Sequence, residues 1–220
     1  MSDDSTKSRK RLLEPMERIS EVLFGLIMVL TFTCSFSVAN AGRSEVRKML
    51  IAALGCNLAW GIIDAVFYIM SCLSEEGHNI LALRAVRMSA DPAEAHRIIA
   101  DALPPVLASV LPEAEFEVMR QKLNQLPEPP ARPRLAKDDW LAATGVFLLV
   151  FLSTFPVAFP FIFITEAQLA LRVSNAVAIA MLFVSGYAFG RYSGFRPARV
   201  GLVMVVVGVA MVGLTIIFGG

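Results

Sequence analysis

Histidine, cysteine and recognisable catalytic motifs are scarce in this sequence. Its 220 residues hold two histidines and three cysteines, and they contain no phosphate-binding loop, zinc-finger spacing or nucleic-acid-binding motif. His78 and His96 have no paired nucleophile, so we expect both to be surface or satisfied helix residues. The sequence therefore predicts a protein that is not an enzyme, carries no cofactor and binds no nucleic acid.

Disulfides and a cleavable leader are also not expected. Cys34, Cys56 and Cys72 lie within or at the ends of apolar runs, where an oxidising enzyme has poor access. The first apolar run is long enough to cross a bilayer and lacks a small-x-small cleavage site, which disfavours a signal peptide.

Apolar residues, by contrast, dominate the composition. Hydrophobic types make up 56% of the chain, whereas soluble domains have about 45–50%. The charged residues are concentrated in the N-terminal tail, one central segment and short loops. Apolar runs of about twenty residues have the length that a helix needs to cross a bilayer. These features predict an all-α integral membrane protein whose surroundings are the lipid bilayer.

We predict five transmembrane helices, with a small cytoplasmic three-helix insert between the second and the third. Residues 1–18 would form a basic cytoplasmic tail, residues 19–72 the first two spans, residues 73–138 the insert and residues 139–220 the last three spans. The spans are expected at about residues 20–41, 49–72, 140–164, 168–189 and 200–218.

The distribution of basic residues predicts the orientation. A cytoplasmic N-terminus places the basic tail, the insert and the arginines of residues 191–199 inside, and it leaves the C-terminus outside. Basic residues at positions 43–48, in the first outer link, are the one misfit. The Ala- and Arg-rich insert and the short loops favour a bacterial inner membrane.

The insert returns to a soluble composition and contains clear helix signals. Asp91 is a good N-cap with Pro92 at the first helical position, and this helix should run to Leu103 and stop at two prolines. Another helix is expected at residues 112–126, and the second span is expected to continue to Met88. Residues 127–134 are rich in proline and predict an extended linker.

Asp64 lies near the middle of the second apolar run. A carboxylate at that depth costs roughly 2.5–3.5 kcal/mol on insertion scales, so such a residue usually faces the bundle interior, water or an ion. Asn57, Trp60 and Asp64 recur at helical spacing and share one stripe of the helix. We therefore take Asp64 as the main functional candidate.

Three interpretations of Asp64 remain open from the residues alone. In a transporter it faces water or a polar cavity, whereas in a scaffold it is sealed against a fixed partner such as Arg172 or Tyr187. A carrier of organic solutes would instead have a roomy pocket lined by Trp60, Tyr68 and other rings.

An antiparallel pairing of the first two spans predicts a metal site inside the membrane. Counting outward from a turn at residues 42–48 sets Met28 level with Asp64, and Cys34 level with Asn57. Sulfur beside oxygen suits borderline or transition metals such as Fe²⁺, Mn²⁺ or Zn²⁺. Nearer the membrane mouth, Glu17 and Glu21 share a helical face on which carboxylates could gather a divalent cation.

Three local runs resemble the vacuolar iron transporter (VIT) family of divalent-metal/proton exchangers. They are residues 24–26 (FGL), residues 155–161 (FPVAFPF) and residues 180–194 (AMLFVSGYAFGRYSG). The layout of two spans, a helical insert and three spans is also similar. In that family the first helix carries an Asp where Met28 stands here, and the second carries a Met and a Glu where Trp60 and Asp64 stand.

The resemblance implies a homodimeric transporter that moves a divalent metal, Fe²⁺ or Mn²⁺, out of the cytoplasm in exchange for protons. The metal is substrate, and Asp64, Asn57, Met28, Cys34 and Trp60 are expected along its path. Capture at the cytoplasmic face is expected from six glutamates: Glu17, Glu21, Glu75, Glu76, Glu113 and Glu117. The alternative is a non-transporting membrane scaffold or sensor whose cytoplasmic insert binds a partner.

Overall fold

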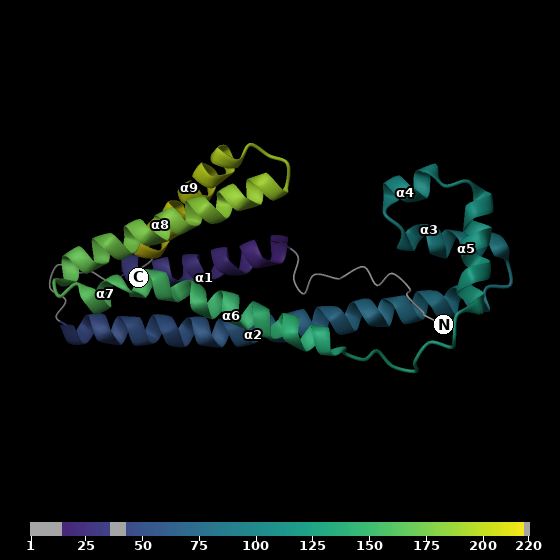
Figure 1. Ribbon diagram of the computed structural model, residues 1–220, viewed down its shortest axis with the longest axis horizontal. Coiled ribbons are helices and arrows are strands. Elements are labelled where there is room, and N and C mark those ends of the chain that lie inside the picture. The colour runs from purple at the N-terminus through teal and green to yellow at the C-terminus, as the bar shows by residue number, and fades with distance from the viewer. Residues whose placement is uncertain (1–14, 36–42, 218–220) are drawn as a thin grey trace, which may run out of the picture. The chain divides into compact units, whose positions relative to one another are not determined.

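The computed structural model describes residues 15–35 and 43–217, and every regular element in these ranges is a helix (Figure 1). The all-α prediction is confirmed for this described part of the chain. Two compact units are present, one within Met1–Tyr68 and Asp138–Gly220 and the other formed by Ile69–Lys137. We call the first the membrane unit and the second the insert.

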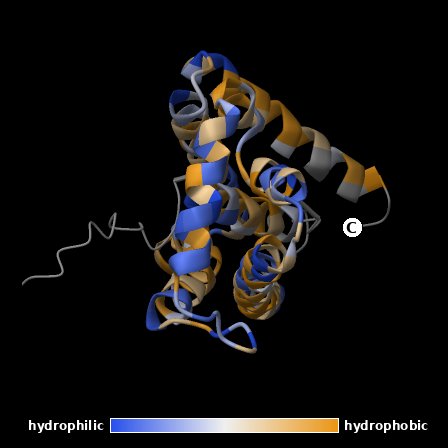
Figure 2. Ribbon diagram, turned by 90° about the vertical axis from the view of Figure 1, so that its right-hand side faces the viewer, coloured by the Kyte–Doolittle hydropathy of each residue, from blue (hydrophilic) through white to orange (hydrophobic). Residues whose placement is uncertain are grey.

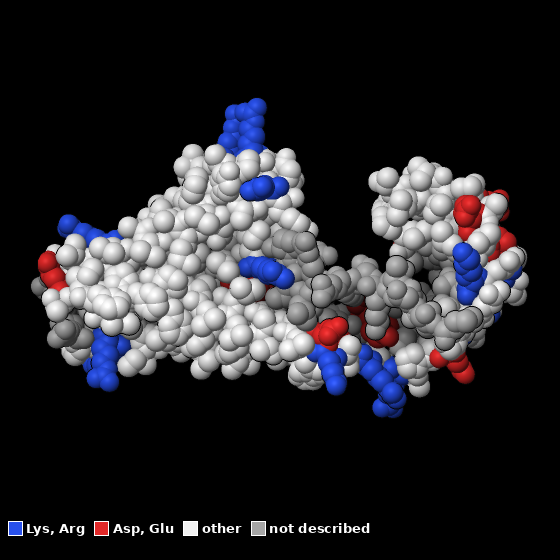
Figure 3. All heavy atoms as spheres, in the orientation of Figure 1, with Lys and Arg blue, Asp and Glu red and all other residues white. Residues whose placement is uncertain are grey.

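Six helices contribute to the described part of the membrane unit. They are α1 (Pro15–Ser35), the first part of α2 (Arg43–Met88), α6 (Lys137–Ala158), α7 (Pro160–Phe163), α8 (Ala167–Tyr192) and α9 (Pro197–Ile217). Among the described residues, three helical stretches are long and apolar enough to cross a membrane, namely Ser44–Met88, Lys137–Phe163 and Ala167–Tyr192, and the five spans stay a prediction. Helix α9 is mostly orange in the hydropathy view (Figure 2), and few charges interrupt the face of this unit in Figure 3.

Helix α1 supplies the centre of the membrane unit. Leu26, Val29 and Leu30 are at most 4% exposed, and they form one core cluster with α2, α6 and α8. The residues that these three helices contribute are Ala53, Val157, Ala178 and Leu182. Helix α1 also accepts a polar contact from α2, because the Asn57 side chain donates a hydrogen bond to the Gly25 carbonyl oxygen.

Glycines set the close approach of α8 and α9. A Cβ at Gly190 would lie 2.9 Å from the Cα of Pro197, and one at Gly186 would lie 3.0 Å from the Cα of Gly201. Small residues at these positions let two membrane helices pack backbone to backbone. Gly213 has no such neighbour within 4 Å.

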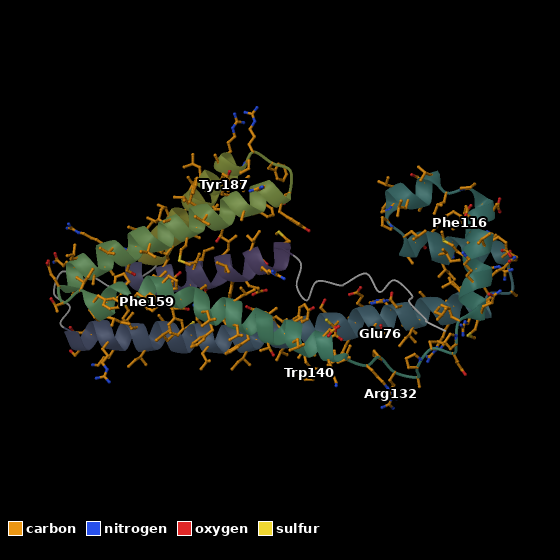
Figure 4. All side chains as sticks on the ribbon, in the orientation of Figure 1. Glu76, Phe116, Arg132, Trp140, Phe159 and Tyr187 are labelled. Atoms are coloured by element: carbon orange, nitrogen blue, oxygen red, sulfur yellow. The ribbon has the colours of Figure 1, made fainter. Side chains whose placement is uncertain are left out.

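Two prolines end α6. Pro156 lies within its last turn, the helix stops at Ala158, and Pro160 begins the short α7. Phe159 lies at this break (Figure 4). Proline lacks the N–H that the preceding turn needs, which explains why the helix is interrupted here.

Helix α2 begins earlier than the sequence suggested. It starts at Arg43 rather than Met49, with Glu45 in its first turn, and it continues to Met88 as expected. An acidic residue in the first turn favours a helix start because it meets the positive end of the helix dipole. Residues that we expected in the link are therefore helical.

The insert combines the last turns of α2 with α3 (Pro92–Ala102), α4 (Pro105–Val110) and α5 (Glu113–Gln125). Asp91 caps α3 by accepting a 3.0 Å hydrogen bond from the Ala93 amide, which confirms the predicted N-cap. Phe116, labelled in Figure 4, packs with Val86 and Ile99 in the core of this unit. Helix α4 was not predicted: the two prolines stop α3, but the second one also starts a new helix.

Candidate functional site

Two carboxyl groups meet between α1 and α2 in the membrane unit. Glu21 of α1 and Asp64 of α2 are hydrogen-bonded through their side chains. Both residues are half-buried. A carboxylate has no hydrogen to donate, so a hydrogen bond between two carboxyl groups requires a proton on one of them. The pair is thus stabilised by a proton or by a cation that replaces it.

An aromatic layer lies one turn from the carboxyl pair. The rings of Phe24 in α1 and Trp60 in α2 form an edge-to-face contact, with centroids 5.4 Å apart and planes at 72°. Because Phe24 follows Glu21 by three residues and Trp60 precedes Asp64 by four, the rings cover the same side of the pair on both helices.

A fully buried amide forms the next layer. Asn57 is 0% exposed, and its Nδ2 donates to the Gly25 carbonyl oxygen of α1 at 3.2 Å and to Thr154 Oγ1 of α6. This side chain therefore joins three helices. Thr154 is itself only 1% exposed.

The other end of the Asn57 amide has no partner within the described part of the protein. Its Oδ1 is buried and accepts no hydrogen bond. A buried polar atom without a partner costs about 1–3 kcal/mol, and native proteins rarely keep one unless water, an ion or function explains it. The layer thus offers one free acceptor oxygen inside the membrane unit.

The pairing of the two helices corrects our count along them. Glu21, rather than Met28, lies opposite Asp64, and Gly25, rather than Cys34, lies opposite Asn57. Met28 is seven residues from Glu21, about 10 Å along the axis of α1. The cause is that α2 begins at Arg43, whereas our count started from a turn at residues 42–48. Each residue of α2 therefore lies opposite an earlier residue of α1 than we expected. The side chain of Cys34 lies outside the described residues.

The oxygen-rich layers favour a hard or borderline cation over a soft one. Carboxylate oxygens suit Mn²⁺, Mg²⁺ and Fe²⁺, whereas the sulfur ligands that we expected would have favoured softer metals. Among the described residues no group of three or more His, Cys, Asp or Glu side chains could enclose a metal. The pair therefore provides part of a coordination shell, and water or backbone oxygens would have to complete it.

Two of the three cysteines belong to the described part of the chain, where neither Cys56 nor Cys72 forms a disulfide. The Cys56 thiol is hydrogen-bonded to Trp60, one turn along the same helix.

Glu117, one of the predicted capture glutamates, is already satisfied. Its Oε2 lies 3.0 Å from His96 Nε2 and accepts from Arg120 Nε at 2.8 Å, and its Oε1 accepts from Arg120 and Gln121. These donors hold the pKa of Glu117 far below its usual range, with the Arg120 hydrogen bonds as the largest cause. Metal capture here would have to displace them.

Within the described part of the insert, no other capture glutamate is hydrogen-bonded to Glu117. Glu75 and Glu113 are exposed on α2 and at the start of α5, and Glu76 is half-buried on α2 (Figure 4). Glu17 lies in α1, with a side chain outside the described residues.

Sequence reasoning missed three residues of the site. Phe24 and Gly25 were noticed only as part of a motif, and Thr154 was not assigned a role. The signal that could have found them is Glu45, because an acidic residue in the first turn indicates that α2 begins at Arg43. Counting from that start would have set α1 against α2 nearer the observed levels.

Comparison with known proteins gives one result. The model of the VIT family matches residues 71–220, which is 150 of the 220 residues. No curated protein matches the chain. The matched residues include the insert, α6, α8 and α9, and they begin after Asp64.

Proposed function

The chain belongs to the VIT family, a family of membrane metal transporters, and we propose that it moves Fe²⁺ or Mn²⁺ out of the cytoplasm in exchange for protons. The observation that carries this proposal is the Glu21–Asp64 pair between two apolar helices. Carboxyl groups are rare in membrane helices, and those present usually mark an ion or proton path.

The chemistry of the pair couples a metal to protons. With no metal bound, the hydrogen bond between the two carboxyls holds a proton. Two neighbouring carboxylates repel each other, so both are ionised together only when a cation lies between them. A bound divalent cation is therefore held by two carboxylates. Metal entry therefore releases the shared proton, and metal departure takes one up.

The layers beside the pair suggest a route. The Phe24–Trp60 contact closes the side of the pair that faces the Asn57 layer. Beyond the rings, the unpartnered Asn57 Oδ1 is the next oxygen that a dehydrated cation would meet. A cation that passes the rings would thus exchange carboxylate oxygens for an amide oxygen.

The proposal includes the topology and the assembly that the sequence predicted. Five spans with a cytoplasmic N-terminus and an outer C-terminus place the insert in the cytoplasm, where it can meet the metal first. A homodimer in a bacterial inner membrane is part of the same proposal. The exposed apolar side chains of α2, among them Leu58, Ile62 and Val66, support contact with lipid or a second copy.

Metal flux in proteoliposomes tests the proposal. The purified chain is reconstituted with an imposed pH gradient, and uptake of Fe²⁺, Mn²⁺ and Co²⁺ is followed together with internal pH. We expect metal-dependent proton movement that disappears in Asp64→Asn. The matched control is Glu166→Gln, which neutralises an exposed carboxylate of the same unit and should leave flux unchanged. No flux of any metal in the native chain would overturn the proposal.

A second candidate function has its own observation. The insert contains an apolar groove of about 450 Å³ between α2, α3 and α5, lined by Leu83, Val86, Ile98 and Met119 among others. A groove of this kind suits a scaffold or sensor that binds a partner through the insert. Absence of flux together with a partner that protects these residues from hydrogen exchange would favour this function.

A further inference from the structure

A second groove runs along the membrane unit between α1, α6 and α8. Its volume is about 550 Å³, and its length follows one stripe of α6 from Leu141 to Pro156. At 1.5 Å per residue this stripe spans about 22 Å, more than the roughly 15 Å of one leaflet's hydrocarbon. The groove is therefore long enough for an acyl chain.

The walls of the groove are apolar and its rim is open. Leu141, Leu148 and Leu152 form an exposed rim, at 59%, 42% and 51%, while Ala142 and Ser153 lie buried in the floor. Gly145 contributes no side chain between them. A glycine within a helix costs about 1 kcal/mol relative to alanine, and here its effect is to keep the groove wide.

One cation lies at the end of this groove. Arg18 of α1 is the single charged residue among the described residues that line it, and no carboxylate does. Gly25 contacts Val150 and Ser153, and Leu30 clusters with Val157 further on, so α1 and α6 run in the same direction. Arg18 therefore lies toward the N-terminal end of α6, near the level of Gly145.

We propose that this groove binds one anionic phospholipid, with its phosphate on Arg18 and an acyl chain along the α6 stripe. A guanidinium presents a planar fork of donors that matches phosphate oxygens, and basic sites between membrane helices bind acidic lipid headgroups. Charge complementarity at one end and apolar walls along the rest fit this amphipathic molecule. The site is separate from the Glu21–Asp64 pair, so it stands independently of metal transport.

A second copy of the chain fits the groove less well. In a two-fold interface both partners present the same surface. Each copy would bring an arginine and leucines to the other, without a carboxylate from the described lining to meet the guanidinium. A buried cation without a partner is costly, whereas a lipid phosphate supplies the missing charge.

Native mass spectrometry of the full chain tests the proposal. The protein is released from nanodiscs that contain equal amounts of phosphatidylglycerol and phosphatidylcholine with identical acyl chains. We expect one phosphatidylglycerol to be retained per chain, with about a fivefold preference, since one arginine near the surface favours an anionic lipid by about that factor. Arg18→Gln should abolish the preference, and Arg18→Lys should keep part of it.

Two further variants make the test specific. Arg191→Gln removes an exposed arginine of α8 that lies outside the groove, and it should retain the lipid as the native chain does. Gly145→Leu fills the groove and should reduce retention although Arg18 is intact, which decides the matter if Arg18→Gln does not fold. Equal retention of the two lipids by the native chain, unchanged retention in both Arg18→Gln and Gly145→Leu, or burial of the groove by a second copy would each overturn the proposal.

Discussion

Two carboxyl groups, one in each unit of this protein, have opposite partners. Glu117 of the insert accepts hydrogen bonds from Arg120 and Gln121 and lies 3.0 Å from His96 Nε2. Asp64 of the membrane unit is hydrogen-bonded to another acid, Glu21. The same functional group is thus surrounded by arginine, histidine and amide donors in one place and faces a second acid in the other.

This difference separates structural from exchangeable carboxyls. The donors around Glu117 satisfy both of its oxygens and tie α5 to α3 through His96. In the acid pair between α1 and α2, Asp64 faces a second acid, so the negative charge between the two carboxyls is balanced by a proton or a metal cation from solution. Exchange of that cation is what transport requires. Acidity alone therefore does not identify a metal site, because the partners of each carboxyl decide what it can do.

The largest effect is expected from neutralising the second acid of the membrane pair. Glu21→Gln should reduce metal flux at least about 100-fold, the scale on which loss of metal-site residues acts. Combining it with Asp64→Asn should cost little more, because residues that act as a unit are not additive. Initial rates of Mn²⁺ uptake into proteoliposomes measure both.

The insert supplies the control for this comparison. Glu117→Gln removes a charge of the same kind and should leave flux within about twofold, as substitutions away from a site usually do. The comparison would break if Glu117→Gln stopped transport while Glu21→Gln left it intact.

A smaller effect is expected from the packing that sets the acid pair. A Cβ at Gly25 would lie 2.7 Å from the Val150 carbonyl oxygen and would also collide with Ser153 Oγ. Gly25→Ala should therefore push α1 away from α6 and destabilise the membrane unit by about 1–3 kcal/mol, as overpacking does. Loss of flux should follow, because Gly25 also accepts the Asn57 hydrogen bond.

Gly55 offers the same substitution without the contact. Nothing lies within 4 Å of a Cβ at this position of α2, so Gly55→Ala should be neutral or stabilise by up to about 1 kcal/mol. Thermal unfolding in one detergent compares the two variants. Equal melting temperatures would mean that the close packing of α1 against α6 at Gly25 does not stabilise the membrane unit around the Glu21–Asp64 pair.

The sequence predicted most of the helices because their signals are local. Asp91 and Pro92 mark the start of α3, and the two prolines after Leu103 mark its end. Helix α4 escaped prediction because Pro105 serves as a stop for one helix and as the first residue of the next.

The site was predicted in parts only. Asp64 and Glu21 were both candidates, but they were assigned to different tasks, because the count along the hairpin depended on where α2 begins. Glycine and threonine carried no chemical signal of their own: Gly25 and Thr154 matter as an acceptor carbonyl and an acceptor hydroxyl for Asn57. Such roles depend on which helices meet, and helix pairing is tertiary information.

The smallest expected effect concerns pH and the insert alone. Because its partners lower the pKa of Glu117, the charged form stabilises the folded insert above the usual glutamate value of about 4.5, and that contribution is lost as pH falls through the lowered pKa. The amides of α3 and α5 should be better protected in the native chain than in Glu117→Gln. This difference should stay constant from pH 7 to about 5 and shrink only in stronger acid.

Hydrogen exchange of the full chain, corrected for intrinsic rates, measures this difference helix by helix. Glu113→Gln is the control, since this exposed glutamate in the first turn of α5 has no part in the His96–Glu117–Arg120 cluster. It should change protection equally little at every pH. The membrane helices should not respond to Glu117→Gln at all, because the carboxyl that this variant removes is satisfied within the insert. A pH-dependent change of protection at Glu21 or Asp64 in Glu117→Gln would show instead that the two carboxyl sites are coupled.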